Sequence, residues 1–426
     1  MNVIHALLEG VPIPNMVMVQ QEFDSSFEEN VEDTVIKELS RPEISQQISN
    51  GRRIAITCGS RSINNIALII RTIAQFCHYR GAMPFIIPAM GSHGGATAEG
   101  QKKICESYGV TEKYCGCPIY SSMEVTHIGV TDFGIPVYID SYAAQADGII
   151  VLNRIKAHPG FSGKYESGLM KMMVIGMGKQ VGAEICHLAG FGKFPQYLET
   201  MGNTILHTAP ILCGIALIEN AYDKTSSITA LTANEIYERE PVLLENAKQK
   251  MPRLLPGRCD VLIVDQMGKD ISGSGMDANI TGRTGSPFKK VTNFSATRVA
   301  TLNLSPKSYG SMGGVGNADI INKRIFEQGD ITLTYPNSIT HTYVKADAIP
   351  MMMDTDKLAI QCAIKTCACE DINRPEIIRI KDTLHLDKLM VSESLVNRIA
   401  NMPGITILSE LMPWAFDSDD NVIDCW

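Results

Sequence analysis

Apolar stretches alternate with amphipathic stretches along most of the chain. RRIAITCGSRSI (Arg52–Ile63) predicts a buried strand followed by a polar turn, and INNIALIIRTIAQFCHYRG then has the apolar spacing of a helix that ends at Gly81. MPFIIPAMGSHGGAT and TAEGQKKICESYG repeat the order of strand, glycine-rich loop and helix. Strands alternating with helices indicate an α/β fold with mostly parallel sheets covered by helices.

The pattern restarts in the second half of the chain. A charged helical segment without glycine covers about residues 231–253, and LLPGRCDVLIVDQMG then gives a Pro-Gly break before a buried strand at Cys259–Asp265. A length of 426 residues is more than one ordinary core accommodates. We therefore predict two domains, residues 1–255 and 256–426, with the active site in the cleft between them.

Composition and charge narrow the classes of function. The formal net charge is −8 and no basic stripe with interleaved aromatics occurs, so no nucleic-acid partner is expected. MNVIHALLEGVPIPNM lacks a basic n-region, and no run of about 18 apolar residues occurs, so we expect neither a signal peptide nor a membrane span. We predict a cytoplasmic protein whose twelve scattered cysteines are buried, reduced thiols.

Polar residues gather in loops that follow the predicted strands, where doubly wound folds place their chemistry. Arg61, in Cys58-Gly-Ser-Arg61, suits a carboxylate or a phosphate, although a surface arginine is the alternative. In the next loop, Gly91-Ser-His93-Gly-Gly-Ala-Thr97, glycines let backbone N–H groups approach a ligand and Thr97 can cap the following helix. His93 is a loop histidine, for which a functional role is favoured over a structural one.

A third and a fourth loop carry further candidates. The third runs from Asn153 to Lys171 and leads on to Cys186-His187. Methionines around Lys171 indicate partial desolvation, which lowers the pKa of an amine and makes it nucleophilic; a lysine reaching to solvent is the alternative. The fourth, Met267–Arg283, is a predicted substrate clamp or an ordinary surface loop. No loop matches a P-loop or a Rossmann fingerprint, so ATP or NAD binding is weakly supported.

Three motifs and one interval stand in a fixed order in the first half. They are Gly91-Ser-His93-Gly-Gly-Ala-Thr97, His158-Pro-Gly-Phe-Ser-Gly163, Ser167-Gly-Leu-Met-Lys171, and His187 sixteen residues after that lysine. This series resembles the lactate racemase family, whose enzymes use a nickel-pincer nucleotide. The resemblance covers most of the first domain and, more loosely, the start of the second.

The resemblance implies a role for each matching residue. The cofactor, a nickel(II) pyridinium-3-thioamide-5-thiocarboxylic acid mononucleotide, would be attached covalently to Lys171, and His187 would be the protein ligand of nickel. Gly91, Thr97, Ser167 and Gly168 would line the cofactor site. His93 and His158 would be the acid/base pair on opposite faces of the substrate. The resemblance also places Arg61 near the substrate carboxylate. From the polar composition of the fourth loop, we expect Lys269, Asn279, Thr281 and Arg283 to contact the substrate from a C-terminal domain that closes over it.

We therefore expect an isomerase, a racemase or epimerase that inverts C2 of a small 2-hydroxy acid by proton-coupled hydride transfer through a 2-keto acid. Three departures from the family bear on the substrate: Cys58 stands where the family has Asp, the loop between His158 and Ser167 is longer, and a second-domain Gln-x-x-Lys pair is not visible. A polar or sugar acid is therefore favoured over lactate. The alternatives are a dehydratase or oxidoreductase on the same scaffold without nickel, or a non-catalytic organic-acid-binding protein. Assembly of the protein into a homo-oligomer is retained as a further possibility.

Overall fold

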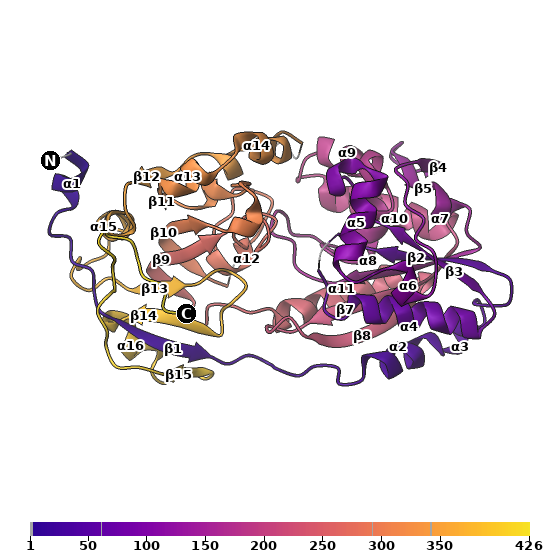
Figure 1. Ribbon diagram of the computed structural model, residues 1–426, viewed down its shortest axis with the longest axis horizontal. Helices are drawn as coiled ribbons and strands as arrows, with labels where there is room; N and C mark the ends of the chain where they lie inside the picture. The colour runs from indigo at the N-terminus through magenta and orange to yellow at the C-terminus, as the bar shows by residue number, and fades with distance from the viewer. Residues whose placement is uncertain (1–2, 61, 292, 341–342) are drawn as a thin grey trace. The chain divides into compact units, whose positions relative to one another are not determined.

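The computed structural model describes residues 3–60, 62–291, 293–340 and 343–426. It divides into an N-terminal unit, residues 24–251, and a C-terminal unit formed by residues 1–23 and 252–426 (Figure 1). The expected division at residue 255 had placed the first 23 residues in the N-terminal domain, and the structure places them in the C-terminal unit. They belong to the C-terminal unit because their strand β1 (Met16–Gln21) pairs with strands β14 (Lys388–Ser392) and β15 (Ile405–Ile407) of that unit.

A five-stranded sheet in the order β3-β2-β6-β7-β8 is the centre of the N-terminal unit. Its strands are β2 (Arg53–Cys58), β3 (Met83–Pro88), β6 (Gly148–Arg154), β7 (Ile211–Glu219) and β8 (Thr225–Thr232). The first four are parallel, and β8 runs antiparallel to β7. Strands β4 (Val125–Val130) and β5 (Pro136–Asp140) form a separate antiparallel hairpin.

Helices cover both faces of this sheet (Figure 1). They are α2 (Val31–Leu39), α3 (Pro42–Ser45), α4 (Ile66–Tyr79), α5 (Ala98–Ser107), α6 (Glu112–Cys115), α7 (Ser141–Ala144), α8 (Leu169–Lys171), α9 (Lys179–Leu188), α10 (Phe194–Thr208) and α11 (Ala233–Lys250), with a 3₁₀ turn η1 (Gly94–Ala96) and a π-helix η2 (Met172–Gly176). Each face has its own core: Ile54 and Ile56 lie in one, and Ala55 lies in the other. Burial on both faces explains why β2 is apolar at successive positions.

The C-terminal unit contains an eight-stranded mixed sheet in the order β12-β11-β10-β9-β13-β14-β1-β15. The strands not yet given are β9 (Arg258–Met267), β10 (Ser295–Leu304), β11 (Ile320–Asn322), β12 (Met351–Met353) and β13 (Ile377–Ile380). From β12 to β13 the strands are parallel, and β14, β1 and β15 are joined by antiparallel pairing.

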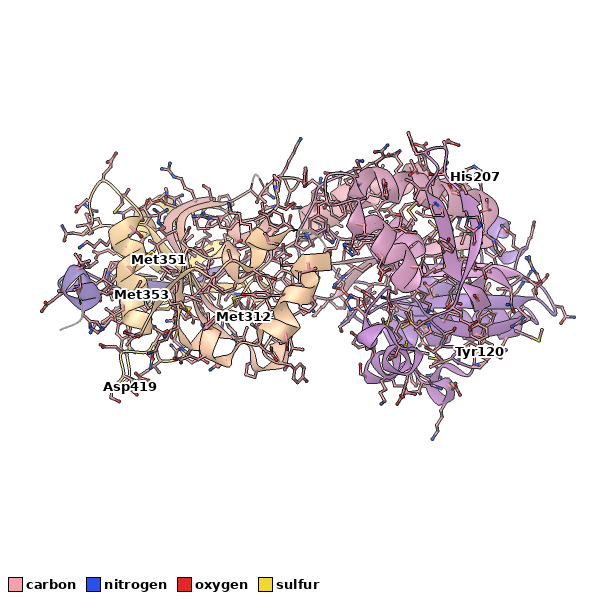
Figure 2. The ribbon with its side chains drawn as sticks, turned by 90° about the horizontal axis from the view of Figure 1, so that it is seen from above. Tyr120, His207, Met312, Met351, Met353 and Asp419 are labelled. Carbon is pink, nitrogen blue, oxygen red and sulfur yellow. The ribbon has the colours of Figure 1, made fainter. Side chains whose placement is uncertain are left out.

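Two apolar layers cover this second sheet as well. Met312 belongs to one and Met353 to the other (Figure 2). The helices are α1 (Val3–Leu8), α12 (Ala278–Thr281), α13 (Arg324–Gln328), α14 (Ile331–Thr340), α15 (Asp356–Thr366) and α16 (Glu393–Ile399), with 3₁₀ turns η3 (Pro306–Ser308), η4 (Val315–Asn317) and η5 (Val344–Asp347). The prediction of an α/β protein with mostly parallel, helix-covered sheets is confirmed. Within the described residues no helix combines the length and the apolarity that crossing a bilayer requires.

The topology of the N-terminal sheet sets where its loops begin. Strands β3, β2 and β6 are parallel neighbours, so their carboxyl ends at Pro88, Cys58 and Arg154 meet at one edge. The loops that carry the candidates His93 and His158 therefore leave from the same edge of the sheet, on either side of the loop that follows β2. Ligand sites of open α/β sheets lie at this edge.

Candidate active site

The segment from residue 155 to residue 168, called the His158 segment below, is folded back on itself after β6. Lys156 and Ser167 exchange two backbone hydrogen bonds of 3.0 and 3.1 Å. The buried carboxylate of Glu166 accepts the backbone N–H of His158 at 2.6 Å and lies 3.1 Å from the ammonium of Lys248 on α11. A glycine-rich stretch is thereby held in one conformation, which gives the His158 ring a defined position.

The ring of His158 has a defined hydrogen-bonding state. Its Nδ1 accepts the backbone N–H of Gly160 at 3.0 Å, so Nδ1 carries the lone pair and the proton of the neutral imidazole is on Nε2. The half-buried ring stacks on Phe161, with centroids 4.3 Å apart at an interplanar angle of 30°. The face and one edge of the ring are fixed, and Nε2 is the nitrogen suited to proton transfer.

His187 packs against the same aromatic side chains. We call Phe161, Phe191 and Phe194 the phenylalanine cluster; its ring centroids are 4.9 to 6.0 Å apart. The His187 ring lies 5.3 Å from Phe194 and 6.5 Å from Phe191, and His158 lies 6.2 Å from Phe191. Two histidines 29 positions apart in the sequence (187 − 158) therefore contact one apolar cluster.

Lys171 closes the short helix α8, and the chain continues directly into the π-helix η2. π-Helical turns are rare and occur frequently at functional sites. Burial raises the pKa of the Cys186 thiol to about 12, and the positive charge of Lys171 acts in the opposite direction. Cys186 directly precedes His187 on α9. The charge of the half-buried Lys171 therefore acts on the turn of α9 that carries His187.

A carboxyl group that the sequence analysis did not single out holds the start of α8. Glu240 on α11 is 1% exposed, and its Oε2 accepts the N–H of Met170 at 2.9 Å. Burial raises the pKa of Glu240 to about 8, opposed by hydrogen bonds from the N–H groups of Met170 and Leu169. A Cβ at Gly168 would lie 2.1 Å from Glu240 Oε1, so this position requires glycine.

The sequence does contain a signal for Glu240. The buried positions of α11 are Ile236, Glu240, Leu244 and Ala247, which follow helical spacing. A carboxylate on the apolar face of an amphipathic helix requires polar partners inside the protein.

The His93 loop, residues 89–97, lies against the π-helix. Gly91 has a φ of +58° and donates its N–H to Gly176 O at 3.2 Å. A Cβ on Gly91 would be 3.2 Å from Ile175 Cγ2, so glycine permits this close approach. Thr97 caps α5 by accepting the N–H of Gly100 at 3.1 Å, as predicted, and the side chain of His93 is exposed.

Arg61 lies outside the described residues. The loop that carries it begins beside the π-helix, because a Cβ on Gly59 would lie 3.0 Å from Met172 Cε. Cys58, just before, is fully buried against Cys105, and this contact together with burial raises the pKa of its thiol.

The candidates of the C-terminal unit make hydrogen bonds within that unit. Arg283 donates to the carbonyls of Ala296 and Thr297 at 3.0 and 2.6 Å and to Asp319 at 2.9 Å. Thr281 is buried and donates to Asp277 O at 3.3 Å. The half-buried side chain of Asn279 donates to Asp277 Oδ1 at 2.8 Å, and the backbone N–H of Lys269 donates to Ser308 Oγ at 3.0 Å. Their substrate contacts stay predictions.

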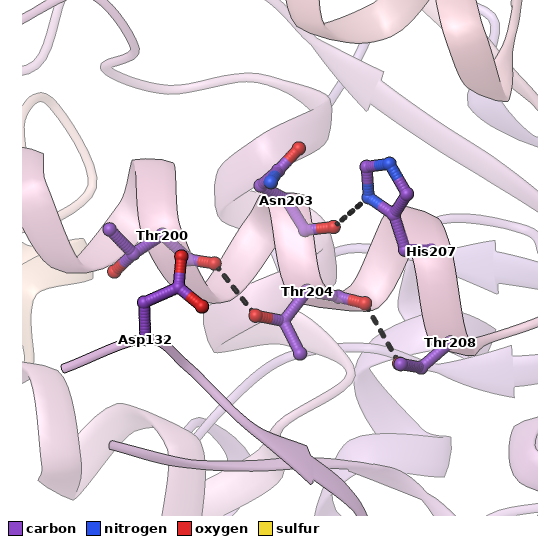
Figure 3. A pocket seen from close by; sticks show the side chains of 6 residues that line it. All are labelled: Asp132, Thr200, Asn203, Thr204, His207 and Thr208. Carbon is purple, nitrogen blue, oxygen red and sulfur yellow. Dashed lines mark hydrogen bonds between the residues drawn. The ribbon is translucent and has the colours of Figure 1, made fainter. Parts of the chain in front are cut away.

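A depression of about 300 Å³ lies between α10 and the turn that joins β4 to β5 (Figure 3). It is lined by Asp132, Thr200, Asn203, Thr204, His207 and Thr208. The hydroxyls of Thr204 and Thr208 donate to the carbonyls of Thr200 and Thr204 at 3.0 and 2.8 Å. These groups serve the helix, and none of the residues predicted to act in catalysis lines this depression.

The described residues contain no cluster of three or more His, Cys, Asp or Glu side chains suited to a metal ion. The metal ligand predicted from the resemblance is the single imidazole of His187.

Comparison with known proteins agrees with the predicted resemblance. Residues 13–192 match the family model of the lactate racemase N-terminal domain, a range that contains His93, His158, Lys171 and His187. The structure of the lactate racemase apoprotein from Thermoanaerobacterium thermosaccharolyticum is similar, with a TM-score of 0.50 at 12% identity over 84% of this chain and 93% of that chain. That likeness shows the fold. A sequence comparison with curated proteins gives no match. We therefore identify residues 13–192 of this chain as a lactate racemase N-terminal domain.

Proposed function

We propose that this protein is a racemase or epimerase that inverts C2 of a 2-hydroxy acid. The observation that carries the proposal is the packing of His158 and His187 on one phenylalanine cluster, with α9 in contact with the π-helix that directly follows Lys171. An amine at Lys171 as tether, an imidazole at His187 as nickel ligand and an imidazole at His158 for proton transfer are the groups that the proposed hydride-transfer inversion would use.

The residues fit a nickel-pincer nucleotide. Imidazole suits nickel by softness and geometry, and Lys171 is half-buried beside the buried Met170 and Met172, an environment that favours an amine able to form a covalent tether. Lys171 would hold the nucleotide and His187 the metal, with Gly91, Thr97, Ser167 and Gly168 lining the site. When bound, this group would accept a hydride from C2 and return it, so that the substrate passes through a planar 2-keto acid.

The chain's own residues would move the protons. The hydrogen on C2 is barely acidic, so the histidines act on the hydroxyl group instead. We propose that His158, through Nε2, and His93, from its exposed loop, face opposite sides of the substrate. One takes the hydroxyl proton when the keto acid forms and the other returns a proton when the inverted hydroxyl forms. Histidine suits both directions because its ordinary pKa is near neutrality.

The substrate we propose is a polar or sugar acid. Arg61 would hold its carboxylate. Lys269, Asn279, Thr281 and Arg283 would contact the remainder of the molecule, and the serines Ser272 and Ser274 of the same loop offer hydroxyls for additional hydrogen bonds. The protein would act on this small molecule in the cytoplasm.

Intact mass tests the tether. The protein is produced together with the enzymes that make the nickel-pincer nucleotide, and the wild type is compared with Lys171→Ala and with Lys164→Ala, which removes an exposed lysine of the same stretch. Wild type and Lys164→Ala should gain the mass of the nucleotide, and Lys171→Ala should not. A mass gain retained in Lys171→Ala would contradict the tether.

The isotope test uses the loaded wild type and a panel of C2-deuterated 2-hydroxy acids. The inverted product should keep deuterium at C2, because a hydride does not exchange with water. Deuterium loss to solvent would indicate proton abstraction instead. Binding of an acid without inversion, or its dehydration or net oxidation, would support one of the other functions considered from the sequence.

A further inference from the structure

Lys179 is a fully buried lysine in the N-terminal unit. It begins α9 with a φ of +54°, a conformation that few residues other than glycine adopt, and its side chain is 0% exposed. Lysine is almost never fully buried unless it is paired. Burial lowers the pKa of its ammonium group, and the carboxylate of Asp140 opposes this effect.

Three contacts satisfy the ammonium group. Nζ donates to the carbonyl of Pro88, where β3 ends and the His93 loop begins. It lies 3.0 Å from Oδ2 of Asp140 and 3.4 Å from Oε1 of Gln101. Oδ1 of Asp140 accepts the N–H groups of Tyr142 and Ala143 at 2.8 and 3.0 Å, so this carboxylate is itself held by the start of α7.

Gln101 connects Lys179 to the His93 loop through hydrogen bonds. It is 0% exposed, and its Nε2 donates to the carbonyls of Gly91 and His93 at 2.8 and 3.2 Å. Because an ammonium group only donates, the amide oxygen must face Lys179 and the NH₂ must face the loop. Lys179 therefore fixes the orientation of Gln101, and Gln101 holds the backbone on both sides of Ser92.

We infer that Lys179 is a positioning residue that sets the His93 loop relative to α9, the helix that carries His187. A buried ion pair is weak evidence for stability, since an apolar pair of similar volume often serves as well. Lys179 itself begins the helix that carries the predicted nickel ligand, and its contacts with Pro88 and Gln101 reach the loop that carries the predicted acid/base histidine. The inference rests on the proposed function for its catalytic meaning, but its structural content is independent of it.

The test uses two variants: one removes the hydrogen bonds from Gln101 to the His93 loop, and the other removes the ion pair between Lys179 and Asp140. Gln101→Leu removes both donors to the His93 loop and leaves Lys179 next to Asp140. The double variant Lys179→Met/Asp140→Asn removes both charges together, so that neither is left buried alone. Gln180→Ala, at the exposed next position of α9, is the matched control and should behave as wild type.

Kinetics of the loaded enzymes give the first readout. Displacement of a catalytic group by about 1 Å can lower a rate about 100-fold. In both test variants we expect kcat for C2 inversion to fall by about 10- to 100-fold. KM should change little, and the mass gained on Lys171 should be retained. Unchanged kcat in both variants would overturn the inference.

Hydrogen exchange of the same proteins gives a readout that does not depend on turnover. Backbone amides of residues 90–97 should exchange faster in both test variants, whereas those of the His158 segment should not change. Equal exchange in the two regions, whether unchanged or faster in both, would overturn the inference. If the wild type inverts no 2-hydroxy acid, the proposed function fails, and the exchange result still decides whether Lys179 and Gln101 hold this loop. Should the double variant fail to fold, Gln101→Leu alone decides.

Discussion

Two glycine-rich polar stretches, the His158 segment with the following helices and the loop at residues 267–283, look alike in sequence but differ in structure. In the first, His158 and His187 converge on one phenylalanine cluster, and neighbouring carboxylates support the backbone. In the second, Thr281 and Arg283 make hydrogen bonds within their own unit. Candidate side chains of the second stretch are thus bonded to the protein itself, whereas in the first stretch Glu166 and Glu240 bind the backbone and the candidate histidines pack on one aromatic cluster.

The largest effect, a loss of turnover, should come from a glycine substitution in the first stretch. Gly168→Ala would place a Cβ 2.1 Å from Glu240 Oε1 and displace the carboxylate that supports α8. We expect a loss of about 1–3 kcal/mol in the free energy of unfolding, typical of overpacking. Turnover should fall about 100-fold, because Lys171 is on the displaced turn. Urea denaturation and the C2-inversion assay measure the two effects.

Gly313→Ala in the C-terminal unit is the control, since its Cβ would be 3.7 Å from the nearest heavy atom, Ser311 Oγ. It should change neither quantity appreciably. An equal effect of Gly313→Ala would show that the losses in Gly168→Ala do not come from its contact with Glu240.

An intermediate effect should appear in the pH dependence of stability. The pKa of Glu240 is raised from 4.5 to about 8, so between these values the folded protein holds a proton that the unfolded chain has released. Its contribution therefore makes stability fall as the pH rises from 4.5 to about 8, by at most about 1.4 kcal/mol per pH unit, and level off above.

Denaturation of the wild type and of Glu240→Gln from pH 5 to pH 9 measures this contribution as their difference. Glu238→Gln, at an exposed position of the same helix, should leave the pH profile unchanged. A wild-type profile retained in Glu240→Gln would show that the carboxyl of Glu240 does not hold the proton.

The smallest effects should separate two residues of the second stretch. Arg283→Met leaves the carbonyls of Ala296 and Thr297 and the carboxylate of Asp319 without this donor. Since these acceptors are partly exposed, the free energy of unfolding should fall by about 0.5–1.5 kcal/mol. Asn279→Ala should cost less than about 1 kcal/mol, because its amide makes one partly exposed contact. If Asn279 contacts the substrate, its removal should raise KM several-fold. A large stability loss in Asn279→Ala with unchanged KM would assign it a structural role.

Much of the fold could be predicted because the apolar pattern is local. The strand after Arg52, the helix ending before Gly81 and the strand Cys259–Asp265 correspond to β2, α4 and β9. Strand β1 could not be placed in this way, since its partners β14 and β15 are near the other end of the chain. The β4–β5 hairpin was not predicted, because its positions are mostly half-buried or exposed and the apolar pattern along its strands is therefore weak.

The candidate site was predictable to the same extent: residues close together in the sequence were identified, and contacts between distant segments were not. The spacing of the motifs identified His158, Lys171 and His187 as candidates, and these residues belong to one continuous stretch of the chain. Lys179 was passed over because a lysine between Gly178 and Gln180 resembles a surface residue, and its burial depends on Asp140 and Gln101 from other elements. The phenylalanine cluster likewise becomes visible only when α10 packs against the His158 segment.

The position of β1 has a consequence for the order in which the chain folds during synthesis. The N-terminal unit, residues 24–251, can complete its sheet as soon as it has left the ribosome. β1 lies between β14 and β15, so it emerges first but must wait for the last strands before it can pair. A nascent chain stalled before residue 388 should therefore hold a finished first unit with an unpaired apolar leader, the segment that a chaperone would bind.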